Sequence, residues 1–455
     1  MSEPCDLSLT DAAAAIAARG LTPADLLEST LTRVERVEPR VQAWARLRVE
    51  EARREARRLT ELQERGTLLG PLHGIPMGAK DIFYTAGTET ACGSRIMEGF
   101  VPAFDATAVA RVRERGAIII GKTHTTEFAS FDPSPARNPW ALDHTPGGSS
   151  SGSGAALAAR MCHGALGSQT SGSIVRPSAF CGTVGLKPTF GRVSRHGVHP
   201  LAWTLDHPGP MARTVRDVAV LLEAIAGPDA NDPATLSAPP PPAYAALLDG
   251  ADDAVRGIRI GIPDRYFLDD VDPEGEELYR TALRVLETLG CGPREIRLPT
   301  EFEAGMEAHE IIHNVEAAAV HVDRYRARSG DYGAKLRAII ETGLQIPAPT
   351  YVRAQQIRTV VIRRLRNLLR EVDVIATPAA LGPAPAGLAS TGSPVLNRPF
   401  SFTGFPSITV PCGFTEAGLP IGLQIAGRPF EEATILRVAA AYEAATGWGE
   451  RIPSL

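Results

Sequence analysis

Two clusters of small residues between Pro146 and Pro188 constrain this chain more than any other feature. The first cluster is GGSSSGSG at 147–154 and the second is GSQTSGS at 167–173, with the Ala-rich run AALAAR between them. Glycine costs about 1 kcal/mol relative to alanine in a helix interior, so sequence this rich in Gly and Ser favours neither helix nor strand. Apolar sequence such as SAFCGTVGL follows closely, which is untypical of a flexible linker. We interpret the stretch as backbone that approaches a ligand closely and offers it serine hydroxyls and N–H groups.

The composition is that of an ordinary globular protein and favours no polyelectrolyte partner. Of the 455 residues, 44 % are hydrophobic and 22 % are charged, as in typical folded domains. A formal net charge of −5 gives no reason to expect nucleic acid or an anionic membrane as partner. No apolar run approaches the roughly 18 residues of a membrane span, and the N-terminus is typical of an amphipathic helix rather than a signal peptide. The six cysteines show no paired spacing, which indicates buried thiols in a reducing compartment, so we expect a cytoplasmic protein.

Hydrophobic periodicity alternates between helical and strand patterns and predicts an α/β fold. Helical patterns cover residues 7–66, 107–116, 215–226, 274–289, 301–370 and 431–446. Apolar runs predict strands at 75–79, 117–121, 258–262, 372–376, 407–414 and 418–427. The predicted architecture is a central mixed β-sheet covered on both faces by helices, in a single domain over 1–455. The Pro-rich segment 233–244 is interpreted as a surface excursion between a core at about 71–227 and a C-terminal part at about 245–455.

Lysine is scarce, which makes each lysine a candidate for a role that needs an amine. Arginine supplies 43 of the 47 basic residues, and the lysines are Lys80, Lys122, Lys187 and Lys335. Arginine cannot act as a proton acceptor, whereas a desolvated lysine can lose its proton near neutral pH. Three readings compete for Lys80: a surface lysine paired with Asp81, a catalytic amine, or a phosphate-binding lysine. The small and apolar residues that precede Lys80 favour its burial.

Two short motifs point to other chemistry. Residues 148–152 fit the G-x-S-x-G elbow of α/β-hydrolases with Ser150 as nucleophile, but the preceding DHTP does not form the strand that the elbow requires. Residues 309–313, HEIIH, fit the H-E-x-x-H pattern on a predicted helix. Zinc could bridge the two histidines of that motif, with its glutamate as base and a third ligand nearby; these residues are His309, Glu310 and His313, with Glu316 or His321 as third ligand. The alternative is an amphipathic helix whose histidines bond to the protein.

Several segments in order resemble the amidase signature family of serine hydrolases. GGSSSGSGAALAA and GSQTSGSIVRPSAFCGTVGLKPTFGRVSRHG resemble its Gly/Ser-rich signature, and GIPMGAKDIF resembles its catalytic-lysine segment. GKTHTTEFA, LDHPGPMARTVRDVA and GLPIGLQIAG are similar to other recurrent segments of the family. The likeness extends from about residue 10 to 450. It implies the amidase-signature fold, with a mixed sheet between layers of helices.

The resemblance also implies a catalytic triad of a lysine, a serine in cis peptide geometry and a nucleophilic serine. Lys80 matches the lysine, Ser149 the cis-serine and Ser173 the nucleophile. A serine hydroxyl needs an adjacent base to attack an amide, and neutral Lys80 can accept the proton of Ser173 relayed through Ser149. The resemblance implies that backbone N–H groups of four residues form the oxyanion hole, namely Thr170, Ser171, Gly172 and Ser173.

This chain departs from the common pattern beside the nucleophile. Many members of the family carry Asp at the position of Gln169 and Gly at that of Ser171, and Arg176 stands one place later than the usual arginine. These departures leave the triad intact and concern the substrate pocket. Arg176 can bind a carboxylate bidentately, with an ion pair in the core as the alternative. We therefore predict substrate contacts for Arg176, Gln169 and Ser150.

The resulting prediction is an amidase that hydrolyses a carboxamide C–N bond through a serine acyl-enzyme. It implies no metal and no organic cofactor, and a small-molecule amide as substrate. The alternative is a glutaminase-type protein similar to the A subunit of glutamyl-tRNA amidotransferase, which generates ammonia from glutamine for a partner. The departures at Gln169 and Arg176 count against that alternative. A zinc hydrolase built on residues 309–313 is a more remote alternative. The identity of the amide, esterase activity and the oligomeric state stay open, with a homodimer among the candidate assemblies.

Overall fold

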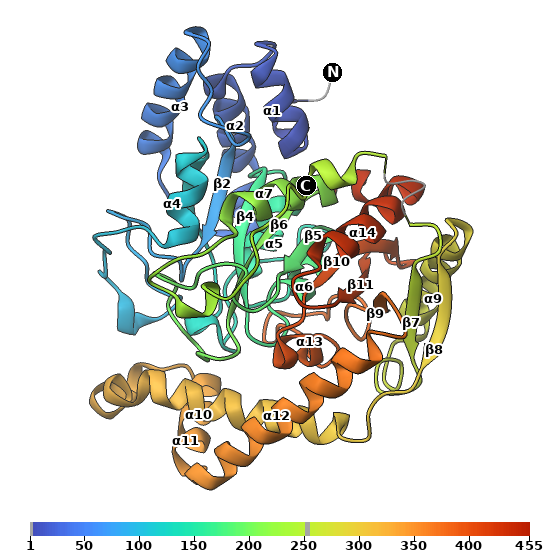
Figure 1. The fold of residues 1–455 in the computed structure, drawn as a ribbon. Helices are drawn as coiled ribbons and strands as arrows, with labels where there is room; N and C mark the ends of the chain where they lie inside the picture. Colours follow the sequence, from blue (N-terminus) through green and yellow to red (C-terminus); the bar gives the residue numbers. More distant parts are fainter. Residues whose placement is uncertain (1–2, 251–254) are drawn as a thin grey trace.

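A computed structural model of the chain describes residues 3–250 and 255–455, which form layers of helices around one twisted sheet (Figure 1). The eleven strands of the sheet lie in the order β1-β3-β2-β4-β6-β5-β10-β11-β9-β7-β8. In that order their bounds are Trp44–Leu47, Ile118–Thr123, Pro76–Lys80, Gly164–Gln169, His207–Ala212, Val184–Lys187, Ser407–Phe414, Pro420–Gly427, Val374–Pro378, Arg259–Pro263 and Gly292–Ile296. β2 pairs in parallel with β3 and β4, and β7 with β8 and β9, whereas the other pairs are antiparallel. The prediction of a mixed sheet is therefore confirmed.

Helices cover both faces of the sheet. They are α1 (Leu9–Ala17), α2 (Pro23–Val41), α3 (Val49–Glu64), α4 (Thr107–Glu114), α5 (Ser151–Ala158), α6 (Val175–Cys181), α7 (Val215–Ile225), α9 (Pro273–Thr288), α10 (Phe302–Arg328), α11 (Ala334–Gln345), α12 (Ala348–Leu368), α13 (Arg398–Thr403) and α14 (Glu432–Thr446). Successive side chains of β3 pack against the helices on opposite faces of the sheet. Ile119 packs in the core that includes α4 and α7. Its neighbours Ile118 and Ile120 pack in the core that includes α2, α3 and α5.

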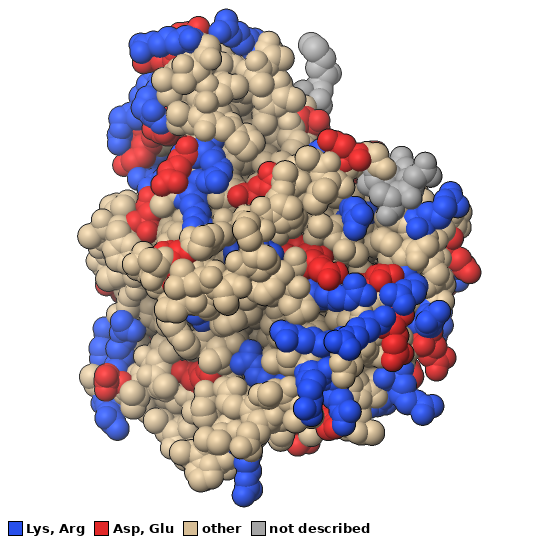
Figure 2. Space-filling model, in the orientation of Figure 1, with Lys and Arg blue, Asp and Glu red and all other residues tan. Residues whose placement is uncertain are grey.

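The N-terminal helices carry mixed charge on their outer surface. Figure 2 shows basic side chains, here all arginines, interspersed with Asp and Glu over α2 and α3, at the upper left of the view. Arg53 pairs with Glu28, and Arg58 pairs with Glu55 one turn away. Over the described part of the chain, none of the helices combines the length and apolar character needed to cross a bilayer. All six cysteines are free and buried, as predicted.

Strand β1 interrupts the helical region expected over 7–66, so that prediction was wrong in detail. The helical region expected over 301–370 is confirmed, as three helices that lie together at the bottom of Figure 1. Glycines at 330 and 333 and a proline at 347 fall at its two breaks, because these residues disfavour continued helix. The second cluster of small residues, judged unfit for a strand, ends the buried strand β4. A Cβ on Gly167 would lie 2.7 Å from the Met211 sulfur, so close packing at the centre of the sheet requires glycine there.

Candidate active site

Lys80 ends strand β2 in the middle of the molecule, with its side chain fully buried. Its Nζ lies 2.7 Å from the Ser149 Oγ and 2.8 Å from the Ser168 Oγ. Burial lowers the pKa of Lys80 well below its ordinary value, and the nearby Asp206 partly opposes that shift. A buried amine with a lowered pKa and two hydroxyl neighbours can act as a proton acceptor near neutral pH.

The surface-lysine reading of Lys80 is wrong, because Asp81 pairs with a different lysine. Lys122 Nζ lies 3.2 Å from the Asp81 Oδ1 and donates to the Phe83 carbonyl and the Thr90 hydroxyl at 2.7 Å each. Both partners of this ion pair are buried. Lys122 therefore has a structural role and leaves the amine of Lys80 free of a carboxylate contact among the described residues.

Ser149 lies against the segment that carries Ser173. The peptide bond between Gly148 and Ser149 is cis, so the cis geometry predicted for Ser149 is confirmed. The next residue, Ser150, donates its backbone N–H to the Ser173 carbonyl oxygen at 3.3 Å. The Ser149 carbonyl accepts from the Thr126 N–H at 3.2 Å. Lys80 therefore contacts Ser149, and the backbone after Ser149 contacts the backbone of Ser173, at the junction of β2, α5 and β4.

The turn after β4 presents a row of backbone N–H groups. In the described chain, the N–H groups of residues 170–173 donate to no other protein atom. The next two N–H groups, of Ile174 and Val175, both donate to the Gln169 Oε1, at 2.9 and 3.0 Å. The Gln169 Nε2 donates to the Ser171 carbonyl and to the Ser401 hydroxyl. Gln169 thus ties the turn to the start of α6 and leaves the earlier N–H groups available for an oxyanion.

The remaining predicted substrate contacts lie inside the protein. Arg176 donates to the Gly148 carbonyl at 2.6 Å, to the Gly392 carbonyl at 2.7 Å and to the Thr391 hydroxyl at 3.2 Å. Burial lowers the pKa of Arg176 to about 9. It has no carboxylate partner among the described residues, so the core ion pair weighed as its alternative is wrong. Ser150 is buried and its hydroxyl bonds with Ser168. The substrate contacts of Arg176, Gln169 and Ser150 stay predictions.

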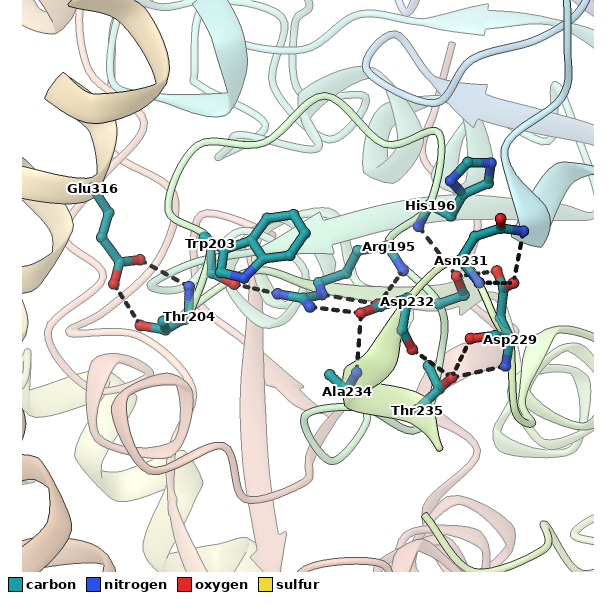
Figure 3. A network of polar contacts seen from close by, with 11 residues as sticks. Arg195, His196, Trp203, Thr204, Asp229, Asn231, Asp232, Ala234, Thr235 and Glu316 are labelled. Atoms are coloured by element: carbon teal, nitrogen blue, oxygen red, sulfur yellow. Dashed lines mark hydrogen bonds and ion pairs between the residues drawn. The ribbon is translucent and has the colours of Figure 1, made fainter. Parts of the chain in front are cut away.

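Asp206 is a site residue that the sequence did not reveal. Its carboxylate accepts from the Thr170 hydroxyl at 2.6 Å and from the N–H groups of Leu201 and Ala202. Burial raises the pKa of Asp206 to about 6. Two contacts fix residues 195–204, which precede Asp206 in the chain. Figure 3 shows them: Arg195 pairs with Asp232, and Thr204 donates to Glu316. Asp206 lies in the segment LDHPGP, but no feature of that segment indicated a contact with the turn.

Replacing Asp206 with Asn is expected to move the acid limb of the pH–rate profile to lower pH. Asp206 is ionised above its pKa of about 6 and raises the pKa of Lys80 by attraction. Without that negative charge, the pKa of Lys80 falls further, so the neutral amine persists at lower pH. The measurement is kcat/KM against pH for wild type, Asp206→Asn and the control Asp143→Asn, whose carboxylate is exposed. An acid limb that stays in place or moves to higher pH would contradict the prediction.

The HEIIH segment does not assemble a metal site. The rings of His309 and His313 stack with centroids 6.1 Å apart on α10. Glu316 accepts from Thr204 and Tyr351, and His321 contacts Tyr332. Residues 3–250 and 255–455 contain no group of three His, Cys, Asp or Glu side chains placed to hold a metal ion. The zinc hydrolase hypothesis is therefore wrong.

A pocket of about 500 Å³ opens beside the turn. Its lining includes Ser171 of the turn, His309 and His313 of α10, and Arg398 at the start of α13. The His309 Nε2 lies 3.4 Å from both the Ser171 hydroxyl and the Thr170 carbonyl. Burial and the nearby Arg398 lower the pKa of His309 well below its ordinary value, so this imidazole is neutral at pH 7. The pocket therefore reaches the turn that follows β4 at Ser171.

Comparisons with known proteins identify the family of the chain. The model of the family described as Amidase matches residues 25–436. The A subunit of glutamyl-tRNA(Gln) amidotransferase from Roseiflexus sp. (strain RS-1) is 41 % identical over 485 residues, which cover 99 % of this chain and 98 % of that protein. Seven further bacterial relatives with the same name are 37–41 % identical.

Solved structures share the whole fold. The peptide amidase from Stenotrophomonas maltophilia superposes with a TM-score of 0.87 at 32 % identity, over 98 % of each chain. One chain of a protein complex, described as vestigial and as revealing the evolutionary origins of an s-triazine catabolic enzyme, superposes with a TM-score of 0.91 at 31 % identity, over 97 % of this chain and 99 % of that one. The protein therefore belongs to the amidase signature family of enzymes, which hydrolyse carbon–nitrogen bonds.

Proposed function

We propose that this protein hydrolyses a carboxamide through an acyl-enzyme on Ser173, with Ser149 and Lys80 as the proton relay. The observation that carries the proposal is the 2.7 Å contact between the buried Lys80 Nζ and the hydroxyl of Ser149. A neutral amine at that position can take a proton from Ser149, which in turn can take one from Ser173. The attack needs no histidine and no metal ion.

The reaction divides into two balanced halves. The Ser173 Oγ attacks the amide carbon, its proton passes through Ser149 to Lys80, and the carbonyl oxygen becomes an oxyanion. The C–N bond then breaks while the relay returns the proton to the leaving nitrogen, which departs as ammonia or an amine. Water attacks the resulting ester through the same relay and releases the carboxylate and free Ser173.

The free N–H groups of residues 170–173 support this mechanism. Each donor aimed at a developing oxyanion is typically worth about 3–4 kcal/mol of transition-state stabilisation. The Gln169 amide oxygen accepts hydrogen bonds from the N–H groups of Ile174 and Val175. It accepts none from residues 170–173. Gln169 therefore supports catalysis as a positioning residue for the turn.

A second candidate function is that of an amidotransferase component, and the relatives favour it more than the residues alone did. Each of the eight bacterial relatives carries the name of the A subunit of glutamyl-tRNA(Gln) amidotransferase. The departures at Gln169 and Arg176 weigh less against it than the sequence suggested, because both side chains bond to the protein itself. In this role the chain would release ammonia from glutamine and pass it to a partner protein.

A panel of amides with ammonia detection tests both functions. The purified protein is assayed alone with neutral aliphatic, aryl, peptide and carboxylated amides and with glutamine, and it is also purified from its native cells under mild conditions. Hydrolysis by the isolated chain supports the amidase. Glutamine hydrolysis that appears only with a co-purified partner supports the amidotransferase component. No turnover of any amide in either preparation would contradict both.

Replacing Arg176 with Ala is expected to lower kcat for carboxylated and neutral amides alike, by roughly 10- to 100-fold. The reason is that its guanidinium donates to the Gly148 carbonyl, directly beside Ser149, and removing one partner of a buried hydrogen bond costs about 1–3 kcal/mol. The measurement is kcat and KM for a matched pair of amides with and without a carboxylate. A loss confined to KM of the carboxylated amide would instead support the substrate contact predicted from the sequence.

A further inference from the structure

Arg398 stands out in the pocket because its charge is uncompensated. It is half-buried at the first position of α13 and lines the pocket beside Ser171. Within the described residues, its guanidinium meets no hydrogen-bond acceptor and no carboxylate, and its Nε is buried without a partner. A buried polar group that the protein leaves unpaired is costly unless a ligand or water satisfies it.

The terminal guanidinium nitrogens of other arginines around the site donate to the chain, although the Nε of Arg176 is also buried without a partner. Arg358 donates to the Phe402 carbonyl at 2.6 Å and to the carbonyl and hydroxyl of Thr204 at 2.8 Å each. Arg176 donates to Gly148, Thr391 and Gly392. Arg398 therefore differs from Arg358 and Arg176, because its guanidinium donates to no acceptor among the described residues. This arrangement is expected of a side chain that binds an external anion.

The position of Arg398 is fixed relative to the reacting groups. The Ser401 hydroxyl, one turn further along α13, donates to the Ser171 carbonyl at 2.7 Å. Residues three apart on a helix share a face, so Arg398 lies on the side of α13 that contacts the turn. The preceding Asn397 packs directly on Gly172, where an added Cβ would lie 2.5 Å from the Asn397 Oδ1. A substrate with its carbonyl at the turn thus has its far end within the pocket that Arg398 lines.

The charges around the pocket select among amides. Its charged lining residues are Arg398, Lys335 and Glu310, and the last two are exposed at its mouth, where Lys335 donates to the Ala389 carbonyl. The two histidines that line it have lowered pKa values because of burial and add no charge at pH 7. The lining carries a net positive charge, which attracts a carboxylate and repels an ammonium group.

We propose that Arg398 binds a carboxylate of the substrate, and that the preferred substrate is a carboxamide with a free carboxylate and no ammonium group. This inference rests on the proposed amidase function and names the substrate class of the same site. A guanidinium fork matches a carboxylate with two parallel N–H···O bonds. Monoamides of dicarboxylic acids belong to this class, whereas glutamine, with its α-ammonium group, does not.

The test compares matched substrates in wild type and in variants of Arg398. The substrates are monoamides of dicarboxylic acids of increasing length, the methyl esters of the same compounds, and glutamine. We expect one chain length to be preferred over its neutral ester and over glutamine. Arg398→Gln should lower kcat/KM for that monoamide by roughly 10- to 150-fold, the range for a hydrogen bond to a charged group. The kcat/KM of the variant for the neutral methyl ester should stay within about threefold of the wild-type value. Arg398→Lys should retain part of the preference.

The matched control is Arg280→Gln, which removes the same charge from an exposed position on α9 where Arg280 pairs with Glu276. It should leave all rates unchanged. Equal rates for monoamides and their esters in wild type, or an equal loss on both in Arg398→Gln, would overturn the inference. A higher kcat/KM for glutamine than for every monoamide would overturn it as well.

A binding measurement separates this inference from the catalytic proposal. In the inactive variant Ser173→Ala, calorimetry should detect the preferred monoamide, and adding Arg398→Gln should weaken its binding by a similar factor. If Ser173→Ala hydrolyses amides normally, the proposed mechanism fails, yet the binding result still reports on Arg398. If the monoamide binds Ser173→Ala with the same Kd whether or not Arg398 is present, the inference fails while the mechanism stands.

Discussion

Replacing Ser173 with Ala is expected to abolish amide hydrolysis, by roughly a millionfold in kcat, as for other serine hydrolases that lose their nucleophile. In the proposed mechanism, the Ser173 hydroxyl forms the bond to the acyl group, so its removal leaves the turn without a nucleophile. The backbone of the turn should persist, because the hydrogen bonds of Gln169 to residues 174 and 175 do not involve the Ser173 side chain. Ammonia release under substrate saturation measures the loss.

The matched control for this prediction lies on the adjoining helix. Ser178 of α6 is buried and its hydroxyl has no partner among the described residues, so Ser178→Ala should keep most of the activity. Trapping adds a second readout: hydroxylamine should divert the acyl group to a hydroxamate in wild type and in Ser178→Ala, and mass spectrometry should find no acyl adduct on Ser173→Ala. Wild-type rates of hydrolysis by Ser173→Ala would contradict the acyl-enzyme mechanism.

The parts of the site that could be predicted are those carried by short, local segments. Composition and order along the chain are enough to recognise the small residues before and after α5. The same holds for the strand that ends at Lys80. The start of α2 follows a local rule too, since Pro23 stands at its first position and the hydroxyl of the preceding Thr22 accepts from the Asp25 N–H. Local rules of this kind depend only on neighbours in sequence.

The parts that could not be predicted depend on contacts between distant segments. Asp206 and Thr170 form a hydrogen bond although they are 36 positions apart in the sequence. No pattern in either segment predicts this contact. Arg398 became distinctive only when the partners of every other side chain around the pocket were known. β4 was not predicted because close packing against Met211 requires a glycine at position 167, and tertiary packing of this kind overrides local propensity.

The burial of Lys80 and of the two motif segments shows why sequence motifs must be weighed against the contacts of their side chains. HEIIH and the elbow at residues 148–152 are both formal matches, yet Glu316 is engaged with Thr204, and the Ser150 hydroxyl bonds with Ser168. Lys80, by contrast, is the buried lysine whose amine meets only oxygen atoms of two serines among the described residues. Lys187 is also buried without a carboxylate partner in the described chain, but its amine donates to the carbonyls of Pro188 and Phe405, whereas that of Lys80 contacts serine hydroxyls.

Replacing Lys80 with Met is expected to lower kcat/KM by about 10²- to 10⁴-fold, the range for a general base. Methionine fills the buried space without offering a proton acceptor. Wild-type activity should fall at low pH as Lys80 becomes protonated, whereas the residual activity of Lys80→Met should lack that acid limb. The control is Lys122→Met, which removes the other buried amine of this region but leaves the relay intact, with rates taken per folded protein.

Stability against pH provides an independent check on Lys80. Burial lowers the pKa of Lys80 in the folded state, so between that value and the ordinary lysine pKa of about 10.4 the unfolded chain holds a proton that the folded chain lacks. Stability of the wild type therefore rises with pH across this window because of Lys80, and Lys80→Met loses that contribution. The Tm of the wild type should rise relative to the variant from pH 7 to pH 9. A difference in Tm that stays constant across this range would mean that Lys80 is protonated in the folded protein and cannot be the base.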